Sequence, residues 1–351
     1  MEKFAASHDS LGAIGTGRSF TFIFQPMKVA VFFSDNHYAS WSLSWGIGRA
    51  FRALGLEVID VPLPPGREFP RSEYEQLKAR IPTLEVLAGC DLIFTAGPEY
   101  LTVWLGHFYG KAAWQKLRTL KAAWYLETSH RDDREFYYEQ YLDWHNEQFY
   151  PGIQDAEEFK GHWLPWAVDT EIFKPLPEQA RTLGVLFTGL LYDQRAAFLK
   201  QMKPHLGSTK VLVREVLQRD VHGINQRGTA ELVADAYRQT QVALNLPSYN
   251  DILVMRVFEA LACGAFLVTH RTREARNMET LEDVSVGWYS TPEEASKQLH
   301  FWLEQPRQKA ISGRALIARK HSLTERMRSL LAILKNEPMP IQQEVEVSCR
   351  A

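Results

Sequence analysis

Apolar residues in the first half of the chain form short runs that we expect to be buried β-strands. These runs lie at residues 28–33, 56–61, 90–97 and 121–130. Between them the apolar positions recur at helical spacing, which predicts helices at residues 44–54, 74–87 and 110–120. Residues 132–150 mix charges with aromatic rings, and we expect a helix there as well. Continuous apolar strands that alternate with helices are typical of a parallel sheet covered on both faces.

A proline-rich connector separates this block from a second block with the same alternation. A short strand at residues 162–164 runs into Pro165, and Pro175 and Pro177 follow. Apolar runs in the second block predict strands at residues 182–189, 210–216, 241–248, 265–269 and 284–289. Helical spacing predicts helices at residues 195–202, 231–240 and 292–306 and a long helical tract at 307–334.

The two blocks predict an α/β protein built from two doubly wound, Rossmann-like domains. A length of 351 residues also favours two domains over one. We place the first domain at residues 27–170 and the second at 171–335, with a flexible N-terminal extension at 1–26 and a tail at 336–351. Ligands of such sheets lie at the carboxyl ends of the strands, so we expect the site in a cleft between the two facing domains.

Composition narrows the range of partners. A net charge of −2 creates no field that would attract nucleic acid or an anionic membrane. No apolar run approaches the ~20 residues of a membrane span. The cysteines Cys90, Cys263 and Cys349 are widely spaced, which argues against a disulfide framework or a zinc site. This cysteine usage favours the reducing environment of the cytoplasm.

A glycine pattern at residues 12–17 (GAIGTG) is similar to part of a dinucleotide-binding loop. It follows no predicted strand, however, and no glycine fingerprint follows the strand at residues 28–33. The sequence therefore disfavours a dinucleotide-dependent oxidoreductase.

One predicted helix of the second block combines a polar start with charged groups inside an apolar sequence. Ser248, Asn250 and Asp251 stand where helix N-caps are favoured. Arg256 and Glu259 are three residues apart, so both lie on one face of the helix. A helix start that carries hydroxyl, amide and carboxylate groups suits the phosphate and sugar groups of a ligand.

Each of these residues has a structural alternative. Glu259 could form an ion pair with Arg256, since a buried carboxylate needs a partner in either case. Asp251 could be a simple N-cap. Asn245 and Ser248 could line a donor site or serve only as polar groups of a strand end and a turn.

Further candidates lie outside this helix. Arg195 follows a predicted turn at Gly189. Its guanidinium could bind a phosphate through two hydrogen bonds, or it could be an exposed arginine at a helix start. Gly46 and Gly48 could let the backbone approach a diphosphate, or could serve helix packing. His130, at the carboxyl end of the fourth predicted strand, is a candidate for contact with an acceptor or a sugar, or is merely hydrogen-bonded.

The residues at 258–269 (FEALACGAFLVT), preceded by Arg256, resemble the donor-site signature of GT-B glycosyltransferases. The resemblance is closest to the bacterial group related to spore maturation protein CgeB and to the glycosyl transferases group 1 domain. Residues 164–175, 185–195 and 312–331 agree with this family in order and spacing. The last of these segments resembles the C-terminal helix that crosses back over the first domain of such proteins.

The resemblance implies transfer of a sugar from a UDP- or GDP-linked donor on the second domain to an unidentified acceptor on the first. In related retaining enzymes, two carboxylates separated by seven residues flank the donor-site helix. Glu259 matches the second of them, which is expected to bind the nucleotide ribose. Asp251 matches the first, where glutamate is more usual, and we expect it and His130 to be catalytic. The other donor-site candidates are Gly46, Gly189, Arg195, Asn245, Ser248, Asn250 and Arg256.

The charge of a departing nucleoside diphosphate can be offset by cations and helix N-termini. The sequence contains no Asp-x-Asp motif that would hold a metal ion, so we expect no metal and no other cofactor. Two alternatives remain open on the same fold: a nucleotide-sugar epimerase or hydrolase, and a non-catalytic module that binds a nucleotide sugar.

Overall fold

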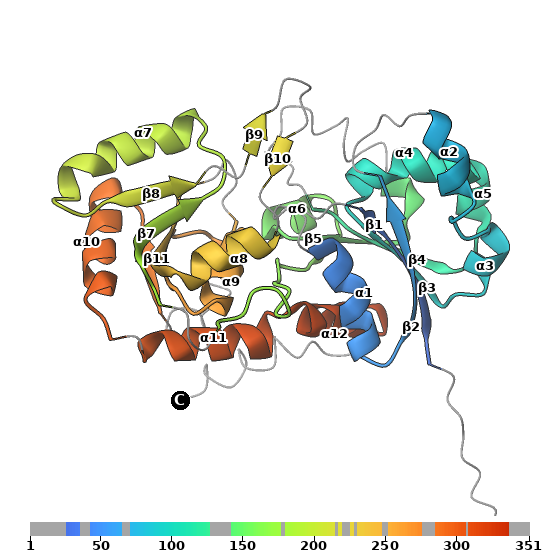
Figure 1. Cartoon of the computed structure of the whole chain (residues 1–351). Coiled ribbons are helices and arrows are strands. Elements are labelled where there is room, and N and C mark those ends of the chain that lie inside the picture. Colours follow the sequence, from blue (N-terminus) through green and yellow to red (C-terminus); the bar gives the residue numbers. More distant parts are fainter. Residues whose placement is uncertain are drawn as a thin grey trace, which may run out of the picture.

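A computed structural model describes most of the chain, and its two lobes each contain a parallel sheet with helices (Figure 1). The described residues are 26–35, 43–64, 71–126, 142–176, 180–214, 217–219, 225–227, 230–247, 252–275, 285–306 and 308–336. We call the half built on the first sheet the first domain and the half built on the second sheet the second domain. Both sheets confirm the predicted α/β class.

The first sheet has the strand order β2-β1-β3-β4-β5-β6, and all its neighbouring strands are parallel. Its strands are β1 (Lys28–Ser34), β2 (Glu57–Leu63), β3 (Leu92–Ala96), β4 (Leu120–Trp124), β5 (Glu147–Tyr150) and β6 (His162–Trp163). Its helices are α1 (Leu43–Ala53), α2 (Arg71–Lys78), α3 (Leu84–Ala88), α4 (Pro98–Tyr109), α5 (Lys111–Lys116), the 3-10 turn η3 (Leu142–Trp144) and α6 (Ile153–Glu158). Strand β3 is buried along its whole length, which explains its continuous apolar sequence.

The second sheet has the order β13-β12-β11-β7-β8 and is also parallel throughout. Its strands are β7 (Leu183–Thr188), β8 (Val211–Arg214), β11 (Thr240–Asn245), β12 (Phe266–His270) and β13 (Val286–Tyr289). Its helices are α7 (Asp193–Met202), the 3-10 turn η4 (Lys203–His205), α8 (Ala230–Arg238), α9 (Met255–Ala262) and α10 (Pro292–Leu303). A separate antiparallel pair joins β9 (Leu217–Arg219) to β10 (Asn225–Arg227).

In each sheet the order of strands reverses once along the chain. The reversal lies between β1 and β3 in the first sheet and between β7 and β11 in the second. Loops at the carboxyl ends of such strand pairs diverge to opposite faces of the sheet and leave a crevice in which ligands bind. The fold alone therefore marks two places for a site.

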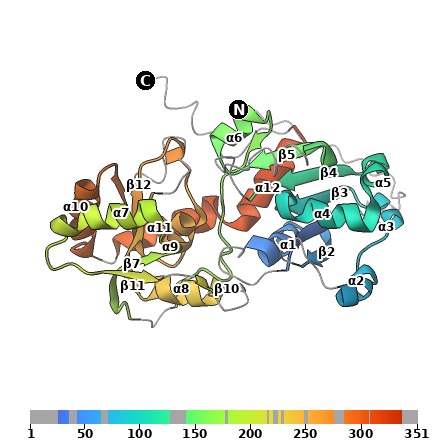
Figure 2. The ribbon, with the colours of Figure 1, turned by 90° about the horizontal axis from the view of Figure 1, so that it is seen from above.

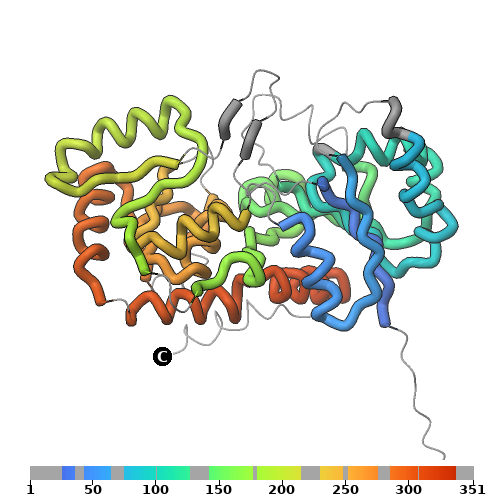
Figure 3. Tube along the Cα trace, viewed as in Figure 1, coloured from blue at the N-terminus to red at the C-terminus, as the bar shows by residue number. Residues whose placement is uncertain are grey.

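The predicted long helical tract is two helices, α11 (Lys309–Lys320) and α12 (Leu323–Leu334), that run beneath the two domains (Figure 3). The break lies at Ser322, whose side chain caps α12 by accepting a hydrogen bond from the backbone of Glu325. Helix α12 packs against α1, as both views show (Figures 1 and 2). The prediction of a C-terminal helix that crosses back to the first domain is confirmed.

Three other predicted helices differ from the observed ones. The helix expected at 74–87 is split into α2 and α3, because Pro82 disfavours helix before it and Thr83 caps α3. The helix expected at 110–120 begins earlier, as α4, and is interrupted at Gly110, whose φ of 74° ends α4. Of the helix expected at 132–150, the described part is η3 and strand β5. Phe149 is fully buried there between β4 and β6, which explains the strand.

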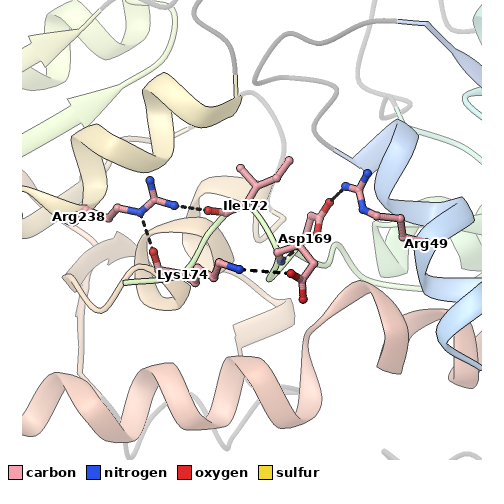
Figure 4. Close-up of polar contacts among 6 residues, drawn as sticks. Arg49, Asp169, Ile172, Lys174 and Arg238 are labelled. Atoms are coloured by element: carbon pink, nitrogen blue, oxygen red, sulfur yellow. Dashed lines mark hydrogen bonds and ion pairs between the residues drawn. The ribbon is translucent and has the colours of Figure 1, made fainter. Parts of the chain in front are cut away.

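The connector between the domains is anchored on both sides (Figure 4). Asp169 forms an ion pair with Arg49 of α1, while Arg238 of α8 donates to the carbonyl oxygens of Ile172 and Lys174. Val168 of the connector pairs in parallel with Ser322, so the two crossings between the domains lie side by side. The connector thus ties the start of the second domain to the helices that flank both sheets.

None of the helices in the described part of the chain is long and hydrophobic enough to cross a membrane.

Candidate functional site

The carboxyl ends of β7 and β11, where the second sheet reverses, carry most of the described candidates. The chain leaves β7 through Gly189, which has a φ of 134° and donates its N–H to the carbonyl oxygen of Arg214 at 3.1 Å. A φ in this range favours glycine. The turn brings the backbone across the open end of the sheet, beside the guanidinium of Arg256.

Arg256 lies in the first turn of α9 and points at this turn. Its Nη1 donates to Oδ1 of Asn245 at 3.0 Å. A Cβ atom on Gly189 would lie 2.7 Å from its Nη2, so only glycine leaves space for the guanidinium there. The sequence predicted Gly189, Asn245 and Arg256 separately, and the structure brings the three together.

Asn245 is fixed by its neighbours so that its carbonyl oxygen faces Arg256. Its Nδ2 donates to Oγ1 of Thr269 at 2.8 Å, and its main-chain oxygen accepts from the hydroxyl of Tyr289 at 2.6 Å. Since a guanidinium can only donate, the amide oxygen must face Arg256. The ends of β11, β12 and β13 are thereby joined in one polar network, which holds Arg256 in place.

Arg195 is buried, with only 4% of its surface exposed, although a solvated position at the helix start was one expectation. Its Nε donates to the carbonyl oxygen of Pro247 at 3.0 Å and its Nη1 to that of Leu190 at 2.8 Å. Its Cζ lies 4.2 Å from the ring centroid of Tyr192. Arg195 therefore joins the loop after β7 to the loop after β11. Its predicted role as a bidentate phosphate ligand stays a prediction.

The two arginines converge on the same aromatic residues. Their Cζ atoms each lie 5.5 Å from the ring centroid of Phe187. Burial raises the pKa of Tyr289, and the charges of Arg195 and Arg256 both act in the opposite direction. Two guanidiniums and the start of α9 thus make the switch point of the second sheet electropositive. Such an arrangement suits a phosphate or diphosphate group.

Glu259 lies one turn further along α9 and is 5% exposed. The hydroxyl of Tyr237 in the neighbouring helix α8 is hydrogen-bonded to Oγ1 of Thr188 at 2.6 Å. Burial, and after it the Glu259 carboxylate, raise the pKa of Tyr237, so this phenol stays neutral. The carboxylate is thus close to the carboxyl end of β7. Its contact with a ribose stays a prediction.

The remaining candidates are not all at this site. Asp251, Ser248, Asn250 and His130 lie outside the described residues. Gly46 lies in α1, where a Cβ atom would be 2.4 Å from Cδ1 of Leu323 and 2.7 Å from Oδ2 of Asp169. These contacts favour the packing role of Gly46, because α12 and the connector leave no room for a side chain.

Several polar residues of the site were not singled out from the sequence. Thr188, Thr269 and Tyr289 occupy or adjoin the last positions of their strands, so a search of strand ends would have found them. Glu274 follows β12 and lies between the domains, and its sequence context carries no comparable signal. Within the part of the chain that the structure describes, no group of three or more His, Cys, Asp or Glu residues could hold a metal ion.

Comparison with known proteins agrees with this fold. Residues 195–332 match the glycosyl transferase-like family, so the match includes Arg195, Asn245, Arg256 and Glu259. No curated protein sequence matches the chain. The narrower resemblance to the CgeB group stays a prediction.

Solved structures that resemble the chain cover nearly all of it. An α-glucosyltransferase in complex with UDP and a 13-mer DNA has a TM-score of 0.63 at 8% identity, over 88% of this chain and 100% of that one. Sucrose-phosphate synthase from Thermosynechococcus elongatus has a TM-score of 0.57 at 13% identity, over 88% and 99%. AviGT4, a glycosyltransferase involved in avilamycin A biosynthesis, has a TM-score of 0.54 at 16% identity, over 89% and 98%. The chain therefore has the GT-B fold of these glycosyltransferases, and its residues 195–332 are similar to the glycosyl transferase-like family.

Proposed function

We propose that the chain transfers a sugar from a UDP- or GDP-linked donor to an acceptor bound on the first domain. The observation that carries this proposal is the guanidinium of Arg256, held by Asn245 beside the turn at Gly189. A fixed cation next to an open glycine turn, at the switch point of a doubly wound sheet, suits a diphosphate. The α-glucosyltransferase of similar fold holds UDP, and so does a similar Anabaena protein, HepE, which was solved with UDP and glucose.

In this proposal each residue has a distinct task. Arg256 pairs with the diphosphate and offsets the charge that develops as the nucleoside diphosphate departs. Arg195 holds the two loops that surround the diphosphate, and Glu259 accepts hydrogen bonds from the ribose. Asp251 and His130 act near the reacting sugar. Protein cations, rather than a metal ion, balance the leaving group.

The carboxylates Asp251 and Glu259 support a further step of the proposal, transfer with retention of configuration. The anomeric signal of the product, followed by NMR from the first turnovers, distinguishes retention from inversion.

Calorimetric titration with UDP, GDP, ADP and TDP in the presence of EDTA tests the donor class. We expect micromolar binding of UDP or GDP and much weaker binding of the others. Absence of binding to all four would refute a nucleoside-diphosphate donor. Incubation of the matching nucleotide sugar without acceptor separates the alternatives, because an epimerase converts the sugar and a hydrolase releases it, whereas a transferase leaves it nearly intact.

A further inference from the structure

Glu274 is a buried carboxylate that holds a backbone amide of each domain. It lies just after β12 in the second domain and is 2% exposed. Its Oε1 accepts from the N–H of Ile153, the first residue of α6 in the first domain, at 3.0 Å. Its Oε2 accepts from the N–H of Leu253, before α9, at 2.9 Å. One side chain therefore fixes two segments that are far apart in the sequence.

The two amides belong to elements that matter for transfer. Leu253 is three residues before Arg256, and the predicted catalytic residue Asp251 is two residues before Leu253. Helix α6 follows closely on the carboxyl end of β5 and lies between the two lobes in Figure 1. The bridge thus connects the start of the donor-site helix to the carboxyl edge of the first sheet.

The surroundings of Glu274 are closely packed. A Cβ atom on Gly152 would lie 3.2 Å from Cγ2 of Ile252, so the backbone of the first domain packs closely against this side chain of the second. The cavity that remains between Ile153, Ile252, Arg273 and Glu274 measures about 20 Å³, enough for about one water molecule. A buried carboxylate that accepts from a helix N-terminus is also favoured by the partial positive charge there.

A second contact between the same two segments is exposed to solvent, unlike the buried contacts of Glu274. Arg273, the neighbour of Glu274, forms an ion pair with Glu157 of α6 at 3.1 Å, and both side chains are 58% exposed. An exposed pair of this kind contributes little because water and salt screen it. Arg273 therefore provides a matched control for Glu274 within the same interface.

We propose that Glu274 is a positioning residue that holds the backbone at Leu253, before α9, in register with the first domain, so that donor and acceptor meet. This inference rests on the proposed sugar transfer for its kinetic part. Its structural part, the simultaneous protection of two backbone amides, does not depend on any substrate.

Hydrogen–deuterium exchange tests the structural part with the full chain. In the wild-type protein we expect slow exchange in peptides that contain Ile153 and Leu253. Glu274→Ala removes the acceptor of both amides, so exchange should accelerate at least tenfold in both segments, whereas Arg273→Ala should change it less than twofold. Acceleration in only one segment, or in neither, overturns the bridge.

Steady-state transfer and nucleotide titration test the functional part. For folded Glu274→Ala we expect kcat to fall at least tenfold, while the Kd of the nucleoside diphosphate rises less than about threefold. Glu274→Gln retains one acceptor oxygen and turns an N–H₂ group toward the other amide, so an intermediate fall in kcat is expected. Unchanged kcat in both folded variants would overturn the positioning role.

The two proposals fail in different ways. If the wild-type protein binds no nucleoside diphosphate, the proposed function fails while the exchange result still decides the bridge. If the nucleotide binds and transfer occurs but Glu274→Ala matches Arg273→Ala in kcat, only the positioning role fails. Where Glu274→Ala does not fold, Glu274→Gln carries the same comparison.

Discussion

The two sheets have closely similar topology but differ in the described side chains at the edges where ligands of such folds bind. At the carboxyl edge of the first sheet, Glu99 of α4 is fully buried, and its Oε1 accepts from the N–H of Leu126 at 2.8 Å. Nearby, the rings of Tyr125 and Tyr150 are stacked with centroids 4.9 Å apart. Burial, and to a smaller extent the charge of Glu99, raise the pKa of both phenols. This edge therefore contains a carboxylate and neutral hydroxyl groups, all of them buried.

The carboxyl edge of the second sheet instead presents Arg195 and Arg256 around the ring of Phe187. A carboxylate repels an anion, whereas guanidinium groups pair with it. The comparison shows that sheets of similar topology can carry different side chains at the strand ends, where ligands of such folds bind. It also agrees with a division in which the diphosphate donor binds the second domain and an uncharged acceptor group binds the first.

The largest effect is expected from removing the guanidinium of Arg256 from the second edge. Arg256→Ala should weaken nucleoside diphosphate binding about 30- to 100-fold, since a hydrogen bond to a charged group contributes roughly 2–3 kcal/mol. Calorimetric titration measures this directly. Arg314→Ala, on the far side of the same domain, should leave the affinity unchanged. Equal affinity of Arg256→Ala and wild-type protein would remove the proposed contrast between the two edges.

A smaller effect is expected from filling the space beside Arg256 without changing any charge. Gly189→Ala places a methyl group 2.7 Å from Nη2 of Arg256 at a φ of 134°. We expect about tenfold weaker nucleotide binding and a loss of about 1–3 kcal/mol in the free energy of unfolding.

Gly184 provides the matched control, because it lies in β7, the strand that ends just before Gly189, and a Cβ atom there would meet nothing within 4 Å. Gly184→Ala should leave both the nucleotide affinity and the stability nearly unchanged. Comparable losses in the two variants would mean that the glycine turn does not shape the site.

The smallest effect concerns pH and separates the two domains by their titrating groups. In the first domain, burial lowers the pKa of His145 to about 3, and its Nε2 is hydrogen-bonded to Oγ1 of Thr95. The ordinary histidine pKa is about 6.5, so between these values the unfolded chain binds the proton and the folded chain does not. The free energy of unfolding should therefore fall as the pH decreases below about 6.5, by about 2 kcal/mol at pH 5 from this residue.

Urea denaturation at pH 7 and pH 5 checks this expectation. His145→Asn should lose about 2 kcal/mol less than the wild-type protein between these pH values. His321, whose pKa burial also lowers to about 3, contributes a similar loss in both proteins. An equal loss in the variant would show that His145 does not carry the pH dependence.

The pattern of apolar residues predicted most strands of both sheets because a strand buried on both faces needs an unbroken apolar sequence. β5 was missed, since its residues Glu147 and Gln148 are polar and only Phe149 and Tyr150 are buried. The breaks at Pro82, Gly110 and Ser322 were missed for another reason. Apolar periodicity continues across them, and the caps that end the helices depend on local backbone geometry.

Of the site, the sequence indicated Gly189, Asn245, Arg256 and Glu259, because charged or polar residues interrupt apolar elements there. It could not show that Gly189 leaves room for the guanidinium of Arg256, since the two residues are on different elements and meet only when β7 lies beside β11. It also could not show that Arg195 is engaged by the carbonyl oxygens of Leu190 and Pro247.

The sequence by itself thus determined the alternation of strands and helices, and with it the α/β class and the polar strand ends. These features depend on residues close together in the chain, where periodicity and turn chemistry act. Only the tertiary structure decided that Glu274 joins Ile153 to Leu253. Such contacts depend on the relative position of whole domains, and a buried carboxylate finds its partners only after both domains have folded around it.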